Sequence, residues 1–188
     1  MATDLLDDAA EAATEPPLPD LFEVVNGQIV EAPPMSFYAG EVADLLNAVL
    51  LTFLATTDIG RSRVERLFHI PLPEDQGRNR RPDLAFVSYE RWAKDRPLAL
   101  TGAALDVVPD LAVEVVSPTD LAEEVMGKVR EYLRGGVRAV WVIFPQTQEL
   151  YAYTGLAPQV YTAADEVPGD PVLPGFRVKL ADLFPPTA

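Results

Sequence analysis

Cysteine is absent from this 188-residue chain, and histidine occurs only once. Without cysteine there is no disulfide framework and no thiolate metal site. A single histidine nearly excludes a Ser-His-Asp triad and a metal site built from several histidines. No apolar run approaches the ~20 residues that span a bilayer, and no basic segment precedes an apolar one at the N-terminus. We therefore expect a cytoplasmic protein that does not contact a membrane.

Basic residues are also scarce, since 15 lysines and arginines stand against 29 aspartates and glutamates, which gives a net charge of −14. Such a charge argues against broad, non-specific nucleic-acid binding. The charge is uneven, however, because nine of the basic residues fall between Arg61 and Arg96. A local basic groove remains compatible with this distribution. The chain has no glycine-rich phosphate loop, no dinucleotide fingerprint and no internal repeat.

The length predicts one folded domain, preceded by a short tail. Residues 1–19 are rich in Asp, Glu, Ala and Pro and carry too little apolar surface to order themselves, so we expect a disordered acidic tail. Residues 20–188 form the domain. It begins with a predicted β-hairpin over 22–31, where Asn-Gly supplies the positive φ angles of a tight turn. An amphipathic helix over 36–56 follows.

The centre of the chain is predicted to form a strand, a helix and a second strand. Residues 111–116 are a short apolar run, as expected of a strand buried on both faces. Ser117 is a candidate helix cap with Pro118 at the first helical position, and the helix would end at Gly135-Gly136. A second buried strand follows at 138–144. Further strands are expected at 61–72, 82–87, 150–153 and 159–161, with a loop at 73–81 and a short helix and loop within 89–109.

Two carboxylates fall on apolar strands, at Asp83 and Glu114. If these strands pair, the carboxylates come within a few ångströms and repel one another, which favours a divalent cation between them. Mg²⁺ suits such oxygen ligands because it keeps several waters and is held by one or two carboxylates. Lys128, at the edge of the inner helical stripe, would orient or deprotonate a water or offset transition-state charge. Glu31, at the end of the hairpin, is a further candidate acid.

Each of these residues also has a structural interpretation. Asp83 follows proline and can be a turn residue, and Glu114 can bond to backbone or to an arginine. Lys128 has Glu124 four residues before it, in the favourable order for a solvated helix pair. His69 fits an ordinary strand position. The spacing alone therefore gives only a hypothesis of a metal site.

The same residues resemble a known family. The segments Pro82-Asp83-Leu84-Ala85-Phe86-Val87 and Glu114-Val115-Val116-Ser117-Pro118, followed by Lys128, Tyr132, Gly136-Val137 and Trp141-Val142, resemble the Uma family of "putative restriction endonucleases", in the PD-(D/E)XK nuclease superfamily. The resemblance extends to the hairpin with Pro33-Pro34 and to 173–176. It covers roughly residues 20–184.

The resemblance implies an α/β (α+β) fold: a restriction-endonuclease-like core with a mixed central sheet flanked by helices. It implies metal binding by Asp83, Glu114 and Val115. The superfamily's usual lysine position, two residues after the second acid, is Val116 here. The resembled family shows the same shift, with the lysine moved to the next helix, which is Lys128. Glu31 matches the family's acid after the hairpin, whereas the family's helix histidine is missing near Ala39.

We therefore expect a Mg²⁺- or Mn²⁺-dependent endonuclease that hydrolyses DNA phosphodiester bonds, with the 61–81 segment on phosphates. One alternative is a non-catalytic nucleic-acid-binding or regulatory protein on a nuclease fold. Another is a carboxylate-based hydrolase for a small substrate. We also expect a homodimer, because cutting both strands is simplest for a two-fold pair and because Trp141, Tyr151, Tyr153 and Tyr161 offer aromatic area near the C-terminal strands.

Overall fold

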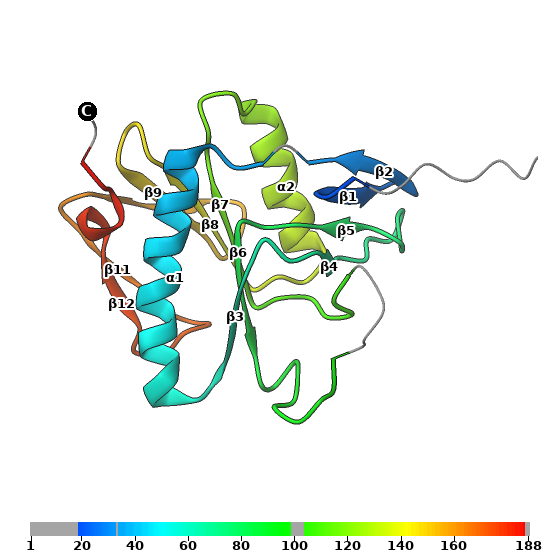
Figure 1. Ribbon diagram of the computed structural model, residues 1–188, viewed down its shortest axis with the longest axis horizontal. Coiled ribbons are helices and arrows are strands. Elements are labelled where there is room, and N and C mark those ends of the chain that lie inside the picture. The colour runs from blue at the N-terminus through cyan, green and yellow to red at the C-terminus, as the bar shows by residue number, and fades with distance from the viewer. Residues whose placement is uncertain (1–18, 33, 99–103, 187–188) are drawn as a thin grey trace, which may run out of the picture.

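The computed structural model describes residues 19–32, 34–98 and 104–186. A six-stranded mixed sheet in the order β10-β9-β8-β7-β6-β3 runs through the middle of the molecule, between two helices (Figure 1). Within this sheet only β7 and β8 are parallel. Its strands are β3 (Gly60–Val64), β6 (Leu84–Ser88), β7 (Leu111–Val115), β8 (Ala139–Phe144), β9 (Glu149–Tyr153) and β10 (Pro158–Thr162).

One face of the sheet is covered by α1 (Phe37–Thr57). Ser36 caps this helix, and its Oγ accepts a hydrogen bond from the Ala39 N–H at 3.3 Å, which satisfies one of the free amides of the first turn. The inner stripe of α1 packs on apolar side chains of β6, β7 and β8. The C-terminal segments join the same apolar core: β11 (Glu166–Pro168), β12 (Arg177–Lys179) and the 3₁₀ helix η1 (Leu180–Leu183).

In the described part of the chain, α1 is the one helix long and apolar enough to cross a bilayer by length and composition. Its inner residues, such as Val42, Leu46 and Leu50, are buried against the sheet. Its outer face carries Glu41 and Asp44, both exposed. This pattern is that of an amphipathic helix on a protein core.

The other face carries α2 (Ala122–Arg134), which connects the parallel strands β7 and β8. Beside α2 lies a smaller sheet in the order β2-β1-β5-β4 (Figure 1). Its β1–β2 hairpin turns at Asn26 and Gly27, whose φ angles are 52° and 73°, as the Asn-Gly pair predicted. Its strands are β1 (Phe22–Val25), β2 (Gln28–Glu31), β4 (Phe68–His69) and β5 (Asn79–Arg80).

The sequence-based boundaries were wrong in five places, one of them the loop expected over 73–81, which contains β5. The second helix begins at Ala122 and not after Ser117, because Asp120 accepts the Ser117 N–H at 2.7 Å and holds a separate turn. The strand expected over 61–72 breaks at Glu65, whose φ is 47°, and resumes as β4. The described part of 89–109 contains no helix. Strand β11 was not predicted. The acidic tail, residues 1–19, falls almost wholly outside the described residues.

Candidate active site

The two predicted acids lie on neighbouring strands. Strands β6 and β7 are antiparallel with Leu84 opposite Val113, so one step further the same register sets Asp83 opposite Glu114. The contact is direct, because the Val115 N–H donates to Asp83 Oδ2 at 2.6 Å. Alternation along each strand turns Leu84 and Val113 toward α1 and turns the two acids toward α2. The sequence therefore brings both carboxylates to one point on one face.

Burial and mutual repulsion disturb both carboxyl groups. Burial, followed by the like charge of Glu114, raises the pKa of Asp83 to about 8. Burial also raises the pKa of Glu114, although Lys128 and Tyr132 oppose this shift. At neutral pH the Asp83 carboxyl therefore holds a proton unless a positive charge comes close.

Lys128 and Tyr132, one turn apart on α2, both bind Glu114. Lys128 Nζ donates to Glu114 Oε2 at 2.9 Å, and the Tyr132 hydroxyl donates to Oε1 at 2.6 Å. Burial alone would lower the pKa of Lys128, but the carboxylates of Glu114 and Glu23 outweigh it, so the pKa is raised. Lys128 thus contacts the strand acid and forms no ion pair with Glu124 in the described structure.

The other two predicted site residues take different places. Glu31 ends β2 opposite Phe22, with an exposed side chain, and lines the same groove as Asp83 and Glu114. Val115 offers its N–H to Asp83, while its side chain is buried on the α1 face. His69 lies in β4, where its N–H donates to the Leu105 carbonyl at 3.0 Å, as expected of a strand residue.

A buried acid that sequence reasoning missed is Glu23, on β1. Its side chain is 7% exposed, and its Oε1 lies 4.0 Å from Lys128 Nζ. The same oxygen accepts the Arg81 N–H at 2.9 Å, and Oε2 accepts from Arg80 Nη1. A signal existed in the sequence: Glu23 interrupts the apolar residues Phe22 and Val24, just as Glu114 interrupts an apolar strand.

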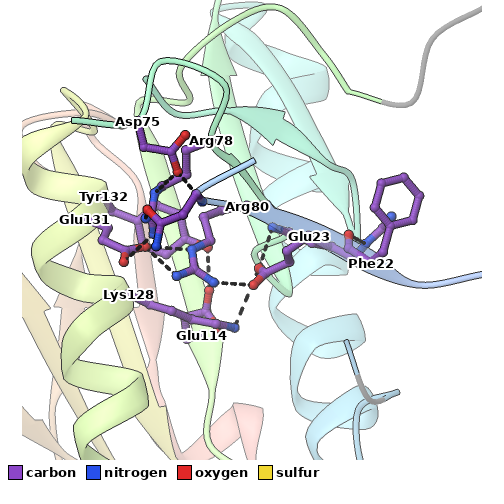
Figure 2. Close-up of polar contacts among 11 residues, drawn as sticks. Phe22, Glu23, Asp75, Arg78, Arg80, Glu114, Lys128, Glu131 and Tyr132 are labelled. Carbon is purple, nitrogen blue, oxygen red and sulfur yellow. Dashed lines mark hydrogen bonds and ion pairs between the residues drawn. The ribbon is translucent and has the colours of Figure 1, made fainter. Parts of the chain in front are cut away.

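Glu23 belongs to a network of alternating charges that joins the hairpin, β5 and α2 (Figure 2). Arg80 Nε donates to Glu131 Oε2 at 2.7 Å, and Arg78 Nη1 lies 2.5 Å from Glu131 Oε1. Arg78 Nε donates to Asp75 Oδ2 at 3.1 Å. Both arginines were expected on a solvated loop or on DNA phosphates. Both arginines instead form ion pairs with carboxylates of the protein itself, and these ion pairs hold the hairpin against α2.

These residues line a groove of about 810 Å³ between the hairpin, α2 and the ends of β6 and β7. Acidic side chains outnumber basic ones on its walls. The acids are Glu23, Glu31, Glu65, Asp83, Glu114, Asp120, Glu124 and Glu131, and the bases are Arg80, Arg81 and Lys128. A polyanion entering this groove would meet repulsion unless cations offset the carboxylates.

The donor set suits a hard divalent cation. Only one oxygen of Asp83 accepts a hydrogen bond in the described structure. Burial and the charge of Glu114 raise the pKa of Asp83 although Lys128 lowers it, so this one lysine does not offset both acids. Among the described residues no three His, Cys, Asp or Glu side chains converge as a complete metal cage. A cation bound here would therefore use two carboxylates and complete its shell with water, which is the mode that Mg²⁺ adopts.

The fold is that of a nuclease-fold protein. The structure is similar to the crystal structure of a "putative nuclease belonging to DUF820" from Anabaena variabilis, with a TM-score of 0.73, 18% sequence identity, and coverage of 87% of this chain and 89% of that chain. The restriction-endonuclease-like fold expected from the sequence is thereby confirmed.

The chain belongs to the Uma2 family, described as "Putative restriction endonuclease", whose family model matches residues 15–181. This match confirms the family that the sequence resembles. No curated protein matches the chain.

Proposed function

We propose that this protein is a Mg²⁺- or Mn²⁺-dependent endonuclease that hydrolyses phosphodiester bonds of DNA. The observation that carries the proposal is the register that sets Asp83 opposite Glu114, with Lys128 bonded to Glu114, at an open groove. Membership of a family described as restriction endonucleases supports the nuclease class. The metal and the DNA substrate are our inference from the chemistry of the site.

Asp83 and Glu114 would hold the cation, with water in its remaining positions. When bound, such a cation polarises the scissile phosphate and lowers the pKa of a coordinated water. Two neighbouring acids, Glu23 and Glu31, lie on the groove wall within the hairpin. Buried Glu23 would hold Lys128 in place. Exposed Glu31 would serve as a further catalytic acid on the solvent side of the groove.

Lys128 acts as a fixed positive charge and not as a base. Its raised pKa keeps it protonated while Glu114 is ionised, so it cannot take a proton from the attacking water. It can instead donate hydrogen bonds to the charge that develops on the phosphate oxygens. The Tyr132 hydroxyl, on the other oxygen of Glu114, fixes the orientation of that carboxylate.

A homodimer remains part of the proposal, because one site cuts one strand and a two-fold pair cuts both. Its aromatic basis changes, however. Trp141, Tyr153 and Tyr161 are buried within the chain itself, at 3%, 5% and 8% exposure. They are not free to cover a second subunit. Light scattering at tens of micromolar measures the assembly, and a monomer mass would contradict this part of the proposal.

Nicking of supercoiled plasmid tests the proposed activity. Wild-type protein should nick in Mg²⁺ or Mn²⁺ and not in EDTA. Asp83→Asn and Lys128→Ala should each lose at least ~100-fold, as removal of one electrostatic group of an active site does. Lys179→Ala, an exposed lysine on β12, is the matched control. Metal-dependent DNA binding without nicking would favour the non-catalytic alternative, and hydrolysis of a small ester without added metal would favour the small-substrate hydrolase.

A further inference from the structure

The arginines of this acidic protein divide into two groups. Of its 15 basic side chains, nine form ion pairs in the described structure. Six do not, although carboxylates are nearly twice as numerous as bases. Four of these six belong to one stretch of sequence and are called here the arginine track: Arg61, Arg63, Arg66 and Arg81.

The track follows the outer edge of the central sheet. Strand β3 is the edge strand, and its Arg61 and Arg63 lie opposite Val87 and Ala85 of β6. Alternation therefore directs both arginines to the α2 side of the sheet, which is also the side of Asp83. At its far end the Arg61 guanidinium lies over the Tyr89 ring, 5.5 Å from the centroid.

The track leads to the groove. Beyond β3, the Glu65 N–H donates to the Asp83 carbonyl at 3.1 Å, and Arg66 follows directly. Arg81 Nη1 donates to the Glu65 carbonyl at 2.6 Å, and Arg81 lines the groove together with Asp83. The arginines of the track also repel one another: burial lowers the pKa of Arg63, and the charges of Arg61 and Arg66 lower it further. Burial lowers the pKa of Arg81, while Glu65 and Glu23 raise it and Arg66 lowers it by a smaller effect.

Clustered arginines that form no ion pair in the described structure attract an external anion, which offsets their mutual repulsion. Acids outnumber bases among the charged residues of the groove, so a polyanion has little to bind there except at the metal centre. We propose that the arginine track binds the phosphate backbone of the nucleic acid on its way to the Asp83–Glu114 site. This inference rests on the proposed nuclease function. It assigns the approach of the substrate to the β3 edge and not to the Arg78 and Arg80 loop.

Phosphate contacts position a nucleic acid and make its affinity depend on salt. The test is fluorescence anisotropy of a labelled DNA duplex, titrated with Asp83→Asn protein so that cleavage does not intervene. In this background we compare two double variants. The track double carries Arg63→Glu and Arg66→Glu, and the control double carries Arg130→Glu and Lys179→Glu. Both doubles change the net charge equally, and the second pair comprises the two other bases that form no ion pair in the described part of the chain.

We expect the track double to lower DNA affinity at least 10-fold and to flatten the slope of log K against log [salt] by about 1.8, or ~0.9 for each lost phosphate contact. The control double should keep the slope within about 0.5 of the parent. Arg66→Glu alone, at an exposed position, should flatten the slope by about 0.9 with an unchanged melting temperature.

Equal losses in both doubles, or no loss in the track double, would overturn the assignment of the surface. Absence of DNA binding by the parent at 50 mM salt would overturn it as well. The nuclease proposal fails separately: wild-type protein that does not nick plasmid in Mg²⁺ or Mn²⁺, beside a track double that loses affinity selectively, would leave a nucleic-acid-binding surface without catalysis.

Discussion

Strand β7 has a buried acid at each end, and the two acids differ in what surrounds them. Asp110, just before the strand, is fully buried and pairs with Arg91 at 2.9 Å and Arg138 at 3.1 Å. It also accepts the Ser88 N–H at 2.7 Å. Glu114, near the other end, has Lys128 and Tyr132 as partners but faces a second carboxylate, Asp83.

The difference separates a structural ion cluster from a candidate active site. Asp110 itself pairs with two arginines, one of which also contacts Glu90. Around Glu114 a single lysine faces both Glu114 and Asp83, while nearby Glu23 also pairs with Arg80, and the groove opens beside them. Burial of an acid therefore does not identify a site by itself. An excess of acid charge next to an open groove does, because it favours a cation.

The largest expected effect on stability is at Asp110, at the end of β7 that carries the structural ion cluster. Asp110→Asn should lower the free energy of unfolding by about 3 kcal/mol, because two arginines lose their buried charge partner. Urea unfolding without metal measures this change. The melting-temperature rise on adding Mn²⁺ should persist, since Asp110 is at the far end of the strand. An unfolding free energy equal to that of the wild type would remove the contrast between the two ends.

Glu114→Gln should also destabilise the metal-free protein, by about 1–2 kcal/mol. Lys128 loses its nearest carboxylate in a buried setting and keeps only Glu23, at 4.0 Å. The matched Asp83→Asn change removes a repelling charge and should hold or raise stability. Chemical denaturation of both variants in EDTA gives the comparison. Equal signs for the two variants would show that the carboxylates are not distinct in role.

Asp83 should make the metal-free protein less stable as pH rises. Folding raises its pKa from 3.8 to about 8, so between these values the folded state keeps a proton that the unfolded state has lost. Stability therefore falls through this window and levels off above it. Asp83→Asn should flatten the profile between pH 5 and 8. A parallel slope in that variant would assign the effect to other groups.

The smallest effect concerns the alternative partner of Lys128. Glu124 is exposed in the first turn of α2 and makes no ion pair with Lys128 in the described structure. Glu124→Ala should change the free energy of unfolding by no more than ~0.5 kcal/mol. Plasmid nicking should stay within about twofold of wild type. A large loss of either would show that the helix pair, and not Glu114, holds the lysine.

Much of this arrangement could be predicted from local sequence. Asn26-Gly27 predicted the hairpin, and the helical spacing of apolar residues predicted α1. Two acids on apolar strands indicated the candidate site. Other features depend on contacts between distant segments. Glu23 becomes a site residue only when β1 packs beside α2, so sequence reasoning chose Glu31 instead. Arg80 looked like a loop residue because its partners lie 57 and 51 positions away in the chain.

The predicted start of α2 was wrong for a local reason. Ser117 followed by proline is a common way to begin a helix. Here Asp120, three residues on, takes the Ser117 N–H, and Ser117 Oγ lies 3.1 Å from Ser36 Oγ at the start of α1. Competing hydrogen-bond partners of similar strength cannot be ranked from sequence order alone.

The most direct test of the central claim, that Asp83 and Glu114 form a cation site, is the melting temperature with and without Mn²⁺. Selective binding to the folded state stabilises it by RT ln(1 + [L]/Kd), or about 2.7 kcal/mol at 100 times Kd. Wild-type protein should therefore melt several degrees higher in Mn²⁺ than in EDTA, and Asp83→Asn should show no rise. No rise in the wild type, or an equal rise in both proteins, would contradict the account.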